Sequence, residues 1–144
     1  MAANFNELLD TNMDDIERPK PLPPGTYFGT VKEYTFDESS QNKTPYVRYI
    51  IVNLEPGEDV DRDALREIPD VYDRTVRRDF FLTQNAKYRL KEFIASTGMK
   101  VDGRSLRQCI ADSVNCRVIV QITQVTSRDG KEIYNNVGEL RGIG

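Results

Sequence analysis

The order of strand-like and helix-like stretches is the feature that most constrains how this chain folds. Three stretches rich in β-branched and aromatic residues come first, at residues 25–36, 46–54 and 72–82. A stretch with apolar residues at helical spacing follows at residues 84–97. Two more strand-like runs follow at residues 114–125 and 132–140, and the Asp-Gly turn between them predicts a hairpin. We therefore expect a mainly β protein with five strands and a helix between the third and the fourth.

Five strands with a helix in that place is the order of an OB-fold, a small barrel whose face and loops bind oligonucleotides. Short helices are also expected at residues 61–67 and 105–111, from the spacing of their apolar side chains. Four prolines before the first strand forbid helix and favour an extended lead-in. We predict an acidic, proline-ended segment over residues 1–21 and a five-stranded OB-fold-like barrel domain over residues 22–144.

The residue types that many enzymes and metal sites use are missing or too few. No histidine occurs in the chain, which excludes Ser-His-Asp or Cys-His catalysis and a histidine-ligated zinc site. The two cysteines, Cys109 and Cys116, lack metal-ligand spacing and are too few for a disulfide framework. No phosphate-binding glycine pattern follows Gly25 or Gly29. We expect a protein that is not an enzyme and that uses no cofactor and no metal.

The charge is unevenly distributed along the chain. Five acidic residues and one arginine give residues 1–18 a net charge of −4, and eight acidic residues and two arginines give residues 55–73 a net charge of −6. Because the whole chain carries −3, the remainder carries +7, which suits a face that binds a polyanion. The second acidic stretch could instead hold a nuclease metal. It lacks an Asp-x-Asp-x-Asp-Gly order, so we favour a solvated loop.

Aromatic and basic residues are interleaved along the first three expected strands, as in a sheet face that binds single strands. Exposed rings stack on bases at roughly 1–3 kcal/mol each, whatever the base, while Arg and Lys contact phosphates. Basic residues also lie in the first and last strand connections, the loops that a barrel would use to clamp a strand. The predicted phosphate contacts are Lys43, Arg48, Arg74, Arg77, Arg78, Arg128 and Lys131. The predicted stacking rings are Tyr46, Tyr49, Phe80 and Tyr134.

The faces of these residues follow from the two-residue period of a strand. Tyr46 and Arg48 should share one face of the second strand, and Arg74, Arg78 and Phe80 should share one face of the third. About half of the rings must fill the core, since the chain has no tryptophan, and the pattern does not decide which. Tyrosine faces outward more readily than phenylalanine because its hydroxyl tolerates water. A merely solvated basic face is the alternative for the arginines.

Three segments resemble small phage-encoded single-stranded-DNA-binding proteins. They are Leu22-Pro23-Pro24-Gly25-Thr26-Tyr27, then Phe80-Phe81-Leu82-Thr83 before the helix, then Asp129-Gly130 with Tyr134-Asn135-Asn136-Val137. The resemblance spans roughly residues 22–140 and implies an OB-fold protein that coats single strands in phage replication or recombination, often beside a recombinase or an exonuclease. It also implies DNA rather than RNA, a choice that the residues alone leave open. Many such proteins end in an acidic tail that recruits replication enzymes, whereas this chain has its acidic, apolar segment at the N-terminus.

We therefore expect a sequence-tolerant single-stranded-DNA-binding protein without catalytic activity. An amphipathic stretch at residues 4–16 is expected to form a helix that recruits replication or recombination proteins. The alternative is a protein-binding adaptor or inhibitor on the same fold, acting through its acidic segments. No apolar run is long enough to span a membrane and no signal pattern begins the chain, so we expect a cytoplasmic protein, in the host cell if phage-encoded. The oligomeric state stays open.

Overall fold

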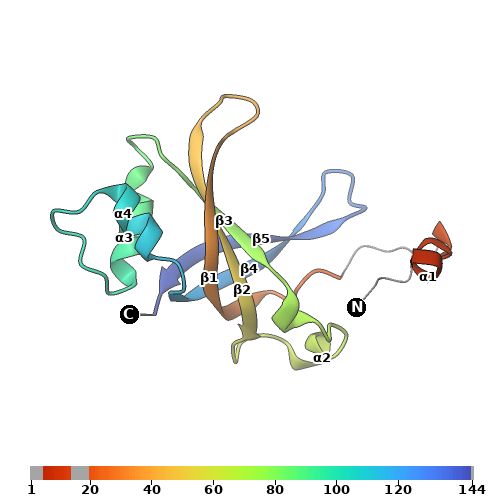
Figure 1. The fold of residues 1–144 in the computed structure, drawn as a ribbon. Coiled ribbons are helices and arrows are strands. Elements are labelled where there is room, and N and C mark those ends of the chain that lie inside the picture. The colour runs from red at the N-terminus through yellow and green to blue at the C-terminus, as the bar shows by residue number, and fades with distance from the viewer. Residues whose placement is uncertain (1–4, 14–19, 144) are drawn as a thin grey trace.

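One sheet of five antiparallel strands forms the body of the protein. The structure, a computed structural model, describes residues 5–13 and 20–143. The strands are β1 (Gly25–Glu38), β2 (Pro45–Pro56), β3 (Val76–Phe81), β4 (Arg117–Thr126) and β5 (Ile133–Gly142). The helices α3 (Lys87–Ser96) and α4 (Leu106–Asp112) lie between β3 and β4 in the chain, and Figure 1 shows them together at one end of the sheet. The expected mainly β fold, with a helix between the third and fourth strands, is confirmed.

The sheet is not closed into a barrel, and on this point the prediction was wrong. The strand order is β3-β2-β1-β4-β5, and within the described residues no ladder joins β3 to β5. The lead-in chain occupies part of this opening, because the Leu22 N–H donates to Asn135 Oδ1 and Asn135 Nδ2 donates back to the Leu22 carbonyl. Arg74, just before β3, donates to the Lys20 carbonyl. These contacts hold the lead-in beside the two edge strands, β3 and β5. A closed barrel would need those two strands to pair directly.

β1 is the central strand and pairs with two neighbours. It pairs with β4 over residues 25–30 and with β2 over nearly its whole length, with two register shifts against β2. Gly29 lies at the first shift. A Cβ atom there would be 2.5 Å from Cγ2 of Ile51, so glycine allows the two strands to approach.

Aromatic rings in the core attach α3 to the sheet. Tyr49 is completely buried, and its ring meets those of Phe80 and Phe93 edge-on at centroid separations of 5.9 and 5.2 Å. The Phe80 and Phe93 rings stack at 5.5 Å. The Tyr49 hydroxyl lies 3.0 Å from Ser113 Oγ, so this buried polar group has a partner. The cluster spans β2, β3 and α3 and thereby fixes where the helices sit relative to the sheet.

The third strand is shorter than predicted. Val71–Asp73 form a single 3-10 turn, and β3 begins at Val76 rather than at residue 72. Arg74 Nε donates to Asp70 Oδ2 at 3.1 Å across this turn. That local ion pair and turn take the chain away from the β2 edge before β3 begins.

The helices follow the predicted positions with different ends. α3 begins later than residue 84, because the Thr83 carbonyl accepts the N–H groups of residues 86 and 87 in a preceding turn. The short α2 (Arg62–Leu65) and α4 lie where helices were expected. The expected N-terminal helix is confirmed only over α1 (Phe5–Leu9), because residues 10–12 are not helical. Residues 4 and 14–16 of that prediction lie outside the described residues. No helix in the described ranges is long and apolar enough to cross a membrane.

Candidate nucleic-acid interface

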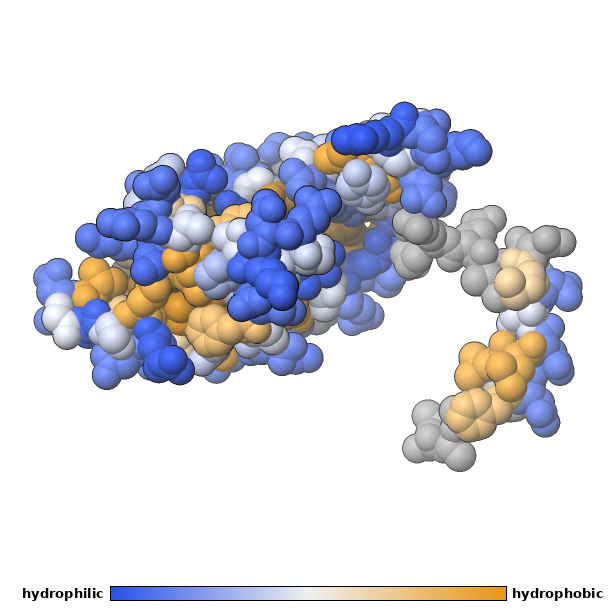
Figure 2. Space-filling view, turned by 90° about the horizontal axis from the view of Figure 1, so that it is seen from above, coloured by the Kyte–Doolittle hydropathy of each residue, from blue (hydrophilic) through white to orange (hydrophobic). Residues whose placement is uncertain are grey.

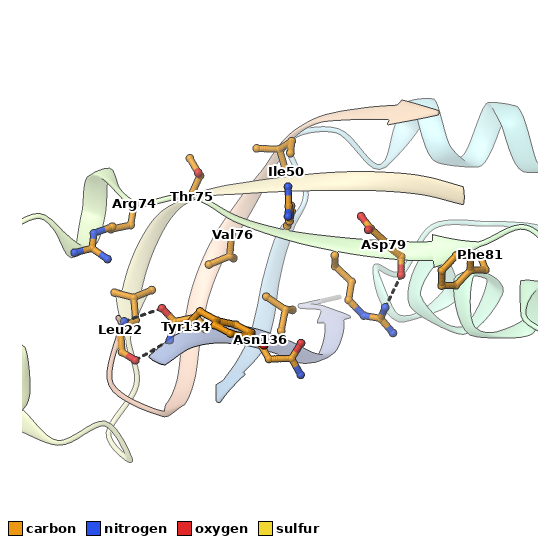
Figure 3. A pocket seen from close by; sticks show the side chains of 13 residues that line it. Leu22, Ile50, Arg74, Thr75, Val76, Asp79, Phe81, Tyr134 and Asn136 are labelled. Atoms are coloured by element: carbon orange, nitrogen blue, oxygen red, sulfur yellow. Dashed lines mark hydrogen bonds between the residues drawn. The ribbon is translucent and has the colours of Figure 1, made fainter. Parts of the chain in front are cut away.

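A groove with a volume of about 760 Å³ lies between the edge strands β3 and β5. Residues 74–79 and Phe81 line one side and residues 134–137 line the other, with Leu22 and Ile50 completing the wall. Figure 3 shows side chains from the β3 region on one side of this opening and those of β5 on the other. The groove exists because the sheet is open, and it brings together residues that are far apart in the sequence.

Arg78 is held in the groove wall with part of its guanidinium unsatisfied. One terminal nitrogen donates to the Asp79 carbonyl, and the guanidinium carbon lies 4.6 Å from the centroid of the Phe80 ring. Its Nε atom is buried and has no hydrogen-bond partner among the described residues. Burial and the nearby Arg89 cation lower the pKa of Arg78. A buried, unpaired N–H on a cation is a position where an anion would be stabilised.

The other two arginines of this region differ from Arg78 in their surroundings. Arg77 is exposed, and no hydrogen bond or ion pair holds it within the described residues. Arg74 is tied down, to Asp70 and to the carbonyl of Lys20. The prediction that Arg74 and Arg78 share a strand face was wrong, because Arg74 precedes the first residue of β3. All three arginines still line the groove, because the groove runs along the edge of residues 74–79 and not along one face of the strand.

Arg48 is neutralised by a partner that the sequence analysis missed. Its guanidinium donates to both carboxylate oxygens of Asp79, from Nε at 2.8 Å and from a terminal nitrogen at 3.0 Å. This hydrogen bond raises the pKa of Arg48, and the guanidinium also lies 5.2 Å from the centroid of the Tyr46 ring. Arg48 and Asp79 lie directly opposite each other in the β2–β3 register. The cross-strand register is therefore the signal that could have predicted this ion pair. The paired Arg48 does not line the groove.

Two of the four predicted stacking rings are core residues, and a third is largely covered by its neighbours. Tyr49 and Phe80 are core residues, so the prediction that bases stack on them was wrong. Tyr46 is 9 % exposed and packs edge-on against Phe81 at 5.9 Å, which leaves little of its ring for a base. The physical reason is strand alternation, because Tyr49 shares the core-facing side of β2 with other buried residues.

Two exposed rings remain at the groove. Tyr134, from β5, is 47 % exposed and was predicted. Phe81, from β3, is 44 % exposed and was missed, although an inward Phe80 implies an outward neighbour by alternation. The rings come from opposite walls, as Figure 3 shows. Asn136 lies beside Tyr134 and adds an amide to the wall.

The predicted loop cations lie outside the groove. Lys43 is exposed in the β1–β2 connection, and Arg128 and Lys131 are exposed in the β4–β5 turn. Figure 1 shows both hairpins projecting well beyond the body of the sheet. Of the predicted site residues, the groove gathers Arg74, Arg77, Arg78 and Tyr134. It does not gather Lys43, Tyr46, Arg48, Tyr49, Phe80, Arg128 or Lys131.

No protein-family model and no curated protein matches this chain. Within residues 5–13 and 20–143, no three side chains of the metal-binding types gather at one place, and this covers the whole acidic stretch at residues 55–73. The chemistry that the groove offers is therefore that of guanidinium groups, amides and two exposed rings. It contains N–H donors for an anion and flat apolar surfaces, and Asp79, its acidic residue, is paired with Arg48.

Proposed function

We propose that this protein binds single-stranded DNA without sequence preference and without catalysis, with the strand in the groove between β3 and β5. The observation that carries the proposal is Arg78, which lines that groove and whose buried Nε has no partner among the described residues. A guanidinium N–H that is withdrawn from water costs free energy unless an acceptor binds it. A phosphate oxygen is such an acceptor, and guanidinium–phosphate hydrogen bonds are among the strongest in proteins.

The other groove residues support a strand rather than a small anion. Arg77 adds a second, exposed cation beside Arg78, at the spacing of adjacent strand residues. Phe81 and Tyr134 offer ring faces from opposite walls, and base stacking contributes roughly 1–3 kcal/mol per base regardless of its identity. Phosphate contacts and stacking both ignore sequence, so the proposed binding is sequence-tolerant.

We further propose that the fold is an OB-type barrel in its partly open form. The strand order β3-β2-β1-β4-β5, with a helix between β3 and β4, supports this, since the OB-fold is a five-stranded and partly open Greek-key barrel. In this proposal β3 and β5 are the two strands that closure would bring together, and the groove is the gap between them. The part played in phage replication or recombination is proposed from the sequence resemblance alone.

Fluorescence anisotropy tests the proposed function. A labelled single strand of about 30 nucleotides, long enough for more than one barrel of this kind, is titrated with the protein at low and high salt and with duplex competitor. We expect tight binding that weakens with salt, by roughly 0.7 in log–log slope for each phosphate neutralised, and that duplex fails to compete. An absence of binding at low salt would overturn the proposal and favour the adaptor alternative, which a pull-down with the N-terminal segment then examines.

A further inference from the structure

α1 carries an apolar surface that nothing in the described structure covers. Phe5, Leu8 and Leu9 are between 64 and 78 % exposed, and Met13 beyond the helix is 82 % exposed. Their spacing places them along one side of a helix, and Figure 2 shows this apolar surface uncovered on the N-terminal segment. A helix of five residues is not stable alone in water, so a bound partner is expected to hold it.

A second groove, of about 460 Å³, lies between α3, α4 and the loop that joins them. Apolar side chains from both helices and the loop form its floor: Ile94, Val101, Leu106 and Cys109. Its rim carries three basic side chains, Lys87, Lys91 and Arg104, and one acidic side chain, Asp102. This groove is separate from the one between β3 and β5, with which it shares no residue.

The rim carries more basic than acidic side chains. Arg104 is paired with Asp112, but no ion pair involves Lys87 or Lys91 within the described residues. Lys87 and Lys91 are four apart on α3, a spacing at which like charges destabilise a helix by a few tenths of a kcal/mol. An acidic ligand on the rim would remove that repulsion.

We infer that α1 of one copy docks into the α3–α4 groove of a second copy. The match is an apolar stripe at helical spacing against an apolar floor, and an acidic segment against a basic rim. Residues 1–18 carry −4, with Asp10 directly after the helix. The groove volume is that of pockets that enclose a few side chains.

A second copy fits better than the same chain. The lead-in is fastened far from α3 and α4, by the contacts of Lys20 with Glu67 and of Leu22 with Asn135. Figure 1 shows α1 and the α3–α4 pair on opposite sides of the sheet. Such a contact joins two different surfaces, so it can repeat from copy to copy in an open series, close into a ring, or be exchanged reciprocally between two copies.

Sedimentation velocity of the full chain without nucleic acid tests this inference independently of the proposed function. We expect the wild-type protein to form dimers or longer species as its concentration rises. Leu8→Asp places a charge in the apolar stripe of α1, and Lys91→Glu reverses a charge on the rim of the groove. Each substitution should weaken association by about tenfold or more. Lys32→Glu is the matched control, because Lys32 is exposed on β1 and lies outside the groove, and it should associate like wild type.

Mixing the two defective variants gives the decisive result. The Lys91→Glu copy keeps an intact α1 and the Leu8→Asp copy keeps an intact groove, so an equal mixture should form heterodimers and stop there. Circular dichroism of each variant confirms that it is folded, and both substituted residues are exposed. A wild-type protein that stays monomeric, association that neither substitution weakens, or a mixture that stays monomeric would each overturn the inference.

Discussion

At the scale of single residues, Arg78 is the side chain that most clearly lacks a hydrogen-bond acceptor that a ligand could supply. Its charge is partly buried against Phe80, and Asp79 supplies a carbonyl rather than a carboxylate to it. Burial lowers the pKa of Arg78, and repulsion by the neighbouring Arg89 cation lowers it further. A phosphate in the groove would satisfy Nε and offset the unpaired charge together.

Replacing Arg78 by alanine should therefore weaken binding of a single strand by about ten- to a hundredfold, the effect of losing one charged hydrogen bond worth about 1.5–3 kcal/mol. The salt dependence should become shallower, because one phosphate contact is lost. Anisotropy titrations at several salt concentrations measure both. Arg66→Ala is the control, since Arg66 is exposed at the end of α2 and lies outside the groove. Equal losses in the two variants would point to net charge rather than to the groove.

Tyr49 sets a pH limit on stability. Burial raises the pKa of Tyr49 to about 12, and burial together with the charge of Asp59 raises the pKa of Tyr27 to about 12. The unfolded chain loses these phenolic protons near pH 10, at the ordinary tyrosine value. Unfolding therefore releases protons between pH 10 and 12, so the stabilisation is present below pH 10 and is lost as pH rises through that range.

Tyr49→Phe should flatten this alkaline loss. The variant gives up the contact with Ser113, at a cost of about 1 kcal/mol near neutral pH. Above pH 10 its free energy of unfolding should fall less steeply than that of wild type, by up to about 1.4 kcal/mol per pH unit. Urea unfolding at pH 8, 10 and 11 gives the dependence of the free energy of unfolding on pH for the variant and for wild type. These pH values span the range in which unfolding releases about one tyrosine proton. Parallel curves would show that Tyr49 does not hold its proton in this way.

At the scale of elements, the contact of β5 with the end of α3 leaves no room for a side chain. Gly142 donates its N–H to Ser96 Oγ at 2.7 Å, and a Cβ atom on it would lie 2.5 Å from the Cα of Thr97. This contact anchors the last strand to the helix that carries the basic rim. Because the obstacle is backbone, rotation of a side chain cannot relieve it.

Gly142→Ala should lower the free energy of unfolding by about 1–3 kcal/mol, the usual cost of overpacking. Gly138→Ala is a matched control on the same strand, because its Cβ would meet the Gln121 carbonyl at an ordinary 3.7 Å. That substitution should change stability by less than about 0.5 kcal/mol. Urea denaturation of both variants measures the difference, and similar losses would contradict the steric argument.

The elements themselves were largely predictable, because local periodicity encodes which side of a strand or helix is apolar. The alternation along residues 114–125 predicts β4, and Val118, Val120 and Ile122 are indeed buried. The start of β3 was not predictable in this way. The ion pair of Arg74 with Asp70 and the adjoining turn end the extended run early, and both depend on the path that the chain takes.

At the scale of the whole molecule, the acidic N-terminal segment and the basic remainder have opposite effects on a polyanion. Residues 1–18 carry −4, and α1 buries none of its residues. Deleting residues 1–18 should leave affinity for a strand of about 10 nucleotides, short enough for one copy, unchanged or stronger, since a repulsive charge is removed. The same deletion should abolish self-association. Anisotropy and sedimentation measure the two effects, and a clear loss of affinity for the short strand would place the segment within the binding site.

Element order, the inward face of β4, the absence of histidine chemistry and the division into acidic and basic parts follow from the sequence by itself, because each depends on residue type and local spacing. The groove was decided by tertiary structure, because Arg78 and Tyr134 meet only where β3 and β5 remain unpaired. Register likewise decided that Asp79 neutralises Arg48. Strand pairing joins distant segments, so neither the open edge nor the charges left free beside it can be read from neighbouring residues.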